Sequence, residues 1–235
     1  MILVPATVHG RVLIEPDEGA AVSLRMIAGF HGYAQTAGDM MQELNRIPGA
    51  SGWTRVSIQA LNRFYIRGDS QVVASWMTRE DRDQAIADNI AYVDAVMDRV
   101  PVRTEVPGLS PGHTARAEAR ALRTVVFAGF SQGAAMAYRA ALSGARPAAG
   151  IIALAGDIPP ELKTDAATRH PWPKVLIGVG AKEQWYSGAK LDDDLAFLAK
   201  RGIDHSVVRF EGGHEWTEEF RNAAGAFLAE CRAWH

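Results

Sequence analysis

The stretch Gly129-Phe130-Ser131-Gln132-Gly133 is a G-x-S-x-G sequence. An apolar run at 123–129 leads directly into it, and an Ala-rich segment at 132–142 leaves it. We predict a strand over the first and a helix over the second. Such a tight strand-to-helix turn exposes a serine hydroxyl above a sheet and gives its backbone a strained conformation. Glycine stands at the first and last positions because side chains there would collide.

The rest of the chain alternates apolar, β-branched runs with helical patterns. This alternation predicts an α/β fold, with a mostly parallel central sheet covered by helices on both faces, in one domain over residues 1–235. Two stretches do not fit: 63–78 is predicted as a long loop, and 103–120 is a Pro/Gly-rich insert without an assigned role. The expected strands are 3–8 and 11–15 (an opening hairpin), 22–30, 55–60, 123–129, 149–155, 174–180 and 205–210, and the expected helices are 39–47, 79–100, 132–142, 191–200 and 218–233.

Composition excludes several classes of protein. The 25 basic and 27 acidic residues leave a net charge of −2, so no basic field indicates a nucleic-acid partner. No apolar run approaches ~18 residues and no basic region precedes the apolar start, so we expect neither membrane insertion nor a secretory signal. The single cysteine, Cys231, excludes an intramolecular disulfide and suits the cytoplasm. We expect no cofactor and no metal site, since no histidine spacing fits one.

A serine nucleophile needs a base, and His214 is our candidate. It lies in Gly212-Gly213-His214, between the last predicted strand and the last helix, where a parallel sheet carries its chemistry. Its late place in the chain matches the order Ser, acid, His of this hydrolase class. His31 also follows a strand, but we favour a structural role for it.

Two acids compete for the third position. Glu183 follows the strand at 174–180, and Asp157 follows the strand at 149–155. Both obey the chain order and both lie at strand ends, so these two features leave Asp157 open. We favour Glu183, which follows the strand before the last one. The acids at 192–194 are a weaker choice, because acidic residues at a helix start match the helix dipole.

Two backbone N–H groups are expected to bind the negative charge that develops on a substrate oxygen. One belongs to Gln132, the residue after the serine. The other is the N–H of Tyr33, in the loop that follows the strand at 22–30, where Gly32 lets the backbone approach a substrate.

These residues resemble the phospholipase/carboxylesterase branch of the α/β-hydrolase family, which holds acyl-protein thioesterases and small bacterial carboxylesterases. Besides the serine motif, the similar segments are His31-Gly32-Tyr33-Ala34-Gln35, Ala74-Ser75-Trp76-Met77 and Gly212-Gly213-His214. The family usually has aspartate where this chain has Glu183. The longer side chain can serve, although the substitution keeps the alternative acid open.

The resemblance implies an α/β-hydrolase fold and hydrolysis of a carboxylic ester or thioester, a small-molecule substrate, through an acyl-serine. Other readings are a peptidase or lactone hydrolase, a haloperoxidase-like activity on the same triad, or a binding protein that has lost turnover. Aromatic and Met residues near the strand ends are expected to line an acyl pocket. They are Phe64, Tyr65, Trp76, Met77, Trp185 and Tyr186.

Overall fold

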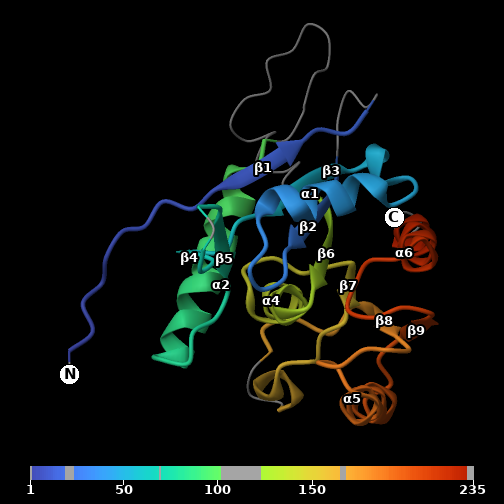
Figure 1. The fold of residues 1–235 in the computed structure, drawn as a ribbon. Helices are drawn as coiled ribbons and strands as arrows, with labels where there is room; N and C mark the ends of the chain where they lie inside the picture. The colour runs from blue at the N-terminus through green and yellow to red at the C-terminus, as the bar shows by residue number, and fades with distance from the viewer. Residues whose placement is uncertain (1, 19–23, 69, 102–122, 165–167, 232–235) are drawn as a thin grey trace, which may run out of the picture.

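The computed structural model describes residues 2–18, 24–68, 70–101, 123–164 and 168–231 (Figure 1). Within these ranges the core is a seven-stranded sheet of order β1-β3-β2-β6-β7-β8-β9, in which only β1 runs antiparallel to its neighbour. The predicted mostly parallel sheet is therefore confirmed. Its strands are β1 (Val12–Glu15), β2 (Arg25–Phe30), β3 (Thr54–Ile58), β6 (Thr124–Phe130), β7 (Gly150–Leu154), β8 (Lys174–Gly180) and β9 (His205–Phe210).

Helices cover both faces of the sheet, as predicted (Figure 1). Alternate residues of a strand point to opposite faces, so Met26 and Ile27 of β2 belong to different cores. The core on the Met26 face includes α2 (Arg82–Arg99), α4 (Gln132–Ser143) and α5 (Gly188–Lys200). The core on the Ile27 face includes α1 (Ala37–Arg46) and α6 (Glu218–Cys231). No helix among the described residues is long and apolar enough to cross a membrane.

Two predicted segments were wrong. Residues 3–8 form no strand, and Leu3 and Val4 are exposed. The following strand β1 pairs with β3 at the sheet edge instead of folding back on them, so there is no opening hairpin. The predicted loop at 63–78 contains β4 (Asn62–Tyr65) and β5 (Val72–Ser75), which pair antiparallel. The insert at 103–120 lies outside the described residues.

The small β4–β5 sheet is fixed to the loop after β2. Gln35 and Ala74 form an isolated antiparallel bridge, in which Ala74 N–H donates to Gln35 O at 3.0 Å. Ala34 N–H donates to Ala74 O at 3.1 Å. The hairpin thus braces this loop at the carboxyl end of the parallel strands, the edge where α/β proteins carry their sites.

Candidate active site

Ser131 lies on a strained turn between β6 and α4. Its φ of 55° and ψ of −120° are unusual for a residue with a side chain. A Cβ on Gly129 would lie 2.2 Å from Gly133 O, so the predicted glycine requirement is confirmed. A Cβ on Gly133 would lie 2.1 Å from Phe30 O, which the sequence did not indicate. The turn therefore lies directly against the end of β2.

Glu183 and His214 meet in the loops that follow β8 and β9. His214 Nδ1 lies 2.7 Å from Glu183 Oε2, and the Glu183 side chain is only 2% exposed. The other oxygen, Oε1, accepts from the N–H groups of Trp185 (2.7 Å) and Tyr186 (3.3 Å). Burial raises the pKa of Glu183, but these hydrogen bonds outweigh it and hold the pKa below its ordinary value. An ionised carboxylate at this distance favours the imidazole tautomer that carries its proton on Nδ1.

The rival acids lie elsewhere. Asp157 is half exposed and pairs with Lys190 at 3.3 Å. Asp194 is buried and accepts hydrogen bonds from Tyr186 Oη at 2.8 Å and Ile158 N–H at 3.0 Å. The structure therefore brings Glu183, and not these two, against His214.

Aromatic packing brings the histidine loop to the serine turn. The His214 ring packs on Phe130, the residue before Ser131, with centroids 4.8 Å apart. Phe130 also contacts Trp216 at 6.5 Å. The imidazole is thus held beside the turn by an apolar contact as well as by its carboxylate.

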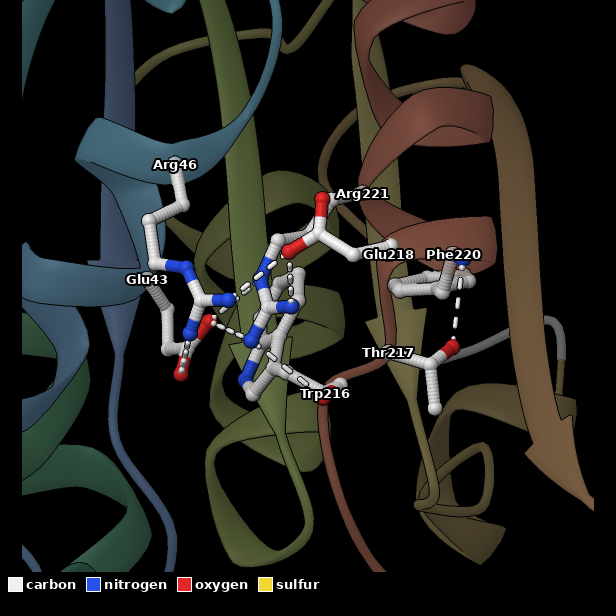
Figure 2. Close-up of polar contacts among 7 residues, drawn as sticks. All are labelled: Glu43, Arg46, Trp216, Thr217, Glu218, Phe220 and Arg221. Atoms are coloured by element: carbon white, nitrogen blue, oxygen red, sulfur yellow. Dashed lines mark hydrogen bonds and ion pairs between the residues drawn. The ribbon is translucent and has the colours of Figure 1, made fainter. Parts of the chain in front are cut away.

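A buried arginine, Arg221, anchors the end of the histidine loop at Trp216 (Figure 2). Arg221 of α6 donates to Trp216 O at 3.2 Å, and its side chain is 4% exposed. It also pairs with Glu43 of α1 at 2.6 Å and with Glu218 at 2.9 Å. The end of the loop is therefore tied to two helices on the same face of the sheet.

The loop after β2 presents one backbone N–H without an internal partner. Gly32 N–H donates to Gln35 Oε1 at 2.7 Å, and Ala34 N–H donates to Ala74 O. Between them, the N–H of Tyr33 has no acceptor within the part of the chain that the structure describes. Gln132 begins α4, where an N–H has no preceding turn to bond. Its side-chain oxygen accepts from Trp76 N–H at 2.7 Å, which fixes this first helical residue to the end of β5.

His31 is fully buried and holds the same loop in place. Its Nδ1 bonds Gly32 O at 2.7 Å, and its Nε2 accepts from Ala60 N–H at 3.0 Å. Burial lowers the pKa of His31 and keeps the ring neutral, as these two bonds require. The geometry agrees with the structural role predicted for it.

A cavity of about 530 Å³ opens beside Ser131 and Gln132. Of the six residues predicted to line an acyl pocket, Met77, Trp185 and Tyr186 border it.

The other three predicted pocket residues do not border this cavity. Trp76 is fully buried: it packs on Phe30 and donates from its indole to His31 O at 3.0 Å. Phe64 stacks on Tyr33 with centroids 5.4 Å apart, and Tyr65 is 68% exposed. Phe64 and Tyr65 belong to β4, and Trp76 follows β5, so the β4–β5 pairing sets where these three side chains lie.

Residues 82–230 match the model of the phospholipase/carboxylesterase family. The chain belongs to this family. The match spans Ser131, Glu183 and His214, whereas the loop at 31–35 lies before it. The α/β-hydrolase fold class is confirmed, and the family makes the chain a carboxylic ester hydrolase.

Solved structures share the fold at low identity. Esterase PE8 is 22% identical with a TM-score of 0.68, over 95% of this chain and 100% of that one. Acyl-protein thioesterase 2 of Zea mays is 15% identical with a TM-score of 0.69, over 95% and 99%. The Bacillus cereus carboxylesterase is 11% identical with a TM-score of 0.65, over 94% of each chain. A search of the curated proteins found no match.

Sequence reasoning missed two features of this family member's site. One is the side chain of Gln132, whose bonds to the end of β5 depend on a distant strand. The other is a set of basic residues around the cavity, of which Arg139 lies seven positions after Gln132. A spacing of seven places Arg139 on the same face of α4 as Gln132, and this spacing is visible in the sequence. Among the described residues, no group of three or more His, Cys, Asp or Glu could hold a metal ion.

Gly133→Ala tests the contact between the turn and the end of β2. The added methyl would overlap the Phe30 carbonyl, so we expect the free energy of unfolding to fall by roughly 2–3 kcal/mol or more. Urea unfolding followed by circular dichroism measures it. Gly188→Ala is the matched control, because its Cβ would meet nothing within 4 Å. Equal stability of the two variants would contradict the contact.

Proposed function

We propose that this hydrolase cleaves carboxylic esters or thioesters through an acyl-serine intermediate, with Ser131 as nucleophile, His214 as base and Glu183 as acid. The observation that carries the proposal is the 2.7 Å contact between His214 and the buried Glu183, beside a serine on a strained strand-to-helix turn. We further propose a single domain and, on the single cysteine, a cytoplasmic location.

The first half of the reaction forms the acyl-enzyme. Ser131 Oγ attacks the substrate carbonyl while His214 Nε2 takes its proton. Glu183 stabilises the imidazolium that results, because its carboxylate is buried and already ionised. The imidazolium then gives the proton to the departing alkoxide or thiolate, and the acyl group stays on Ser131 Oγ.

The second half releases the acid. A water molecule attacks the acyl carbonyl, His214 accepts the water's proton, and the carboxylic acid leaves as the proton returns to Ser131 Oγ. In both halves the carbonyl oxygen becomes negative. The N–H groups of Tyr33 and Gln132 are proposed to bind that oxygen, since neither has an acceptor among the described residues and hydrogen bonds fix the backbone beside both.

Ser131→Ala tests the nucleophile. Removing the hydroxyl leaves no group to form the acyl-enzyme, so kcat for p-nitrophenyl hexanoate should fall by about 10⁶. Stopped-flow or long-time absorbance assays measure the rate, with circular dichroism to show that the variant is folded. A variant that kept a tenth of the wild-type rate would overturn the assignment.

Glu183→Gln tests the acid, with Asp157→Asn as its matched control. An amide in place of the carboxylate presents a donor to Nδ1 and selects the wrong imidazole tautomer, a change that costs up to about 10⁴ in kcat. We expect a loss of at least about 10² for Glu183→Gln and less than about tenfold for Asp157→Asn, because Asp157 is half exposed and paired with Lys190. The reverse order of the two losses would move the acid role to Asp157.

A further inference from the structure

The cavity beside Ser131 is lined by more positive than negative charge. Its basic lining residues are Arg79, Arg82, Arg139 and Lys190, whereas Asp157 is the acidic one among the described residues. Glu161, which does not line the cavity, pairs with Arg139 at 2.7 Å and with Arg82 at 3.4 Å. The fully exposed Asp83 also lies 3.8 Å from Arg82. Three carboxylates therefore face four cations, and the cavity keeps a net positive charge that favours an anion.

Arg139 adds a buried positive charge to the exposed ones of this cavity. Its side chain is 3% exposed and lies on α4, on the same face as Gln132 and Ala135. Nε and Nη2 both donate to one oxygen of Glu161, at 2.8 and 2.7 Å. Nη1 is buried and has no hydrogen-bond partner within the described residues. A buried guanidinium donor without a partner costs free energy that an anionic ligand would recover.

We propose that this cavity binds an anionic group of the ester or thioester substrate, carried on the acyl chain or on the leaving group. The inference rests on the proposed function, since it places the scissile carbonyl at Ser131. Arg139 lies seven positions after Gln132 in the helix, which is about 10 Å along the axis. Helical side chains lean toward the helix N-terminus, so the anion lies within about 10 Å of the carbonyl. A half-ester of a short dicarboxylic acid has this length.

Matched esters measure the preference. For the acyl side, p-nitrophenyl monoadipate and p-nitrophenyl hexanoate share a six-carbon chain and differ by a terminal carboxylate. For the leaving group, 4-carboxyphenyl hexanoate is compared with 4-carbamoylphenyl hexanoate. We expect kcat/KM of the charged ester to exceed that of its neutral partner by at least about tenfold in one arm, and that arm tells which side of the substrate carries the anion.

Arginine variants test whether the cavity causes the preference. Arg139→Gln should lower the charged-to-neutral ratio of kcat/KM by about tenfold, and Arg82→Gln, at an exposed position, by about threefold. A merely structural loss lowers both esters together and leaves the ratio unchanged. Arg99→Gln is the control: it removes the same charge from the same helix as Arg82, and Arg99 Nη1 donates to Ala95 O of that helix at 2.8 Å.

Two results would overturn the inference: a wild-type ratio near one in both arms, or a ratio that neither Arg139→Gln nor Arg82→Gln changes. If Arg139→Gln does not fold, Arg82→Gln decides alone. Cleavage of the neutral hexanoate ester that depends on Ser131 supports the proposed function whatever the ratio. The failure of the inference is therefore distinct from the failure of the proposed function.

Discussion

The backbone contact between Gly133 and the end of β2 is the constraint on which the site depends. Neither glycine of the turn has room for a Cβ. Because both positions are glycine, β6 can pass directly into α4. The same closeness sets the loop after β2 against the start of α4, where we propose that the N–H groups of Tyr33 and Gln132 bind the substrate oxygen. A substitution that pushed the two backbones apart would move the serine turn away from the loop that carries Tyr33.

Strand order accounts for the rest of the site. β8 and β9 are neighbours and parallel, so the loops that leave their carboxyl ends meet, and Glu183 contacts His214. Phe130, the residue before the serine, packs on the imidazole. Arg221 ties the histidine loop to α1 (Figure 2). Packing on Phe130 and the ion pairs of the buried Arg221 thus fix the loop that carries the histidine.

The sequence predicted what depends on local chemistry and failed where distant pairing decides. The serine turn and the parallel strands follow from glycine spacing and β-branched runs, and Glu183 and His214 follow from strand ends. The segment at 3–8 has the composition of a strand, but β3 already pairs with β1 on one side and β2 on the other, so it offers no free edge. Trp76 is aromatic near the site, yet the pairing of β5 with the loop after β2 turns it into the core.

The central claim is that Ser131 is an activated nucleophile, and covalent labelling tests it most directly. The protein is treated with a fluorophosphonate probe, its intact mass is measured, and the modified peptide is sequenced by mass spectrometry. A single adduct on Ser131, slowed by prior addition of an ester substrate, is the predicted result. An unmodified protein after prolonged treatment, or an adduct on another serine, would contradict the account.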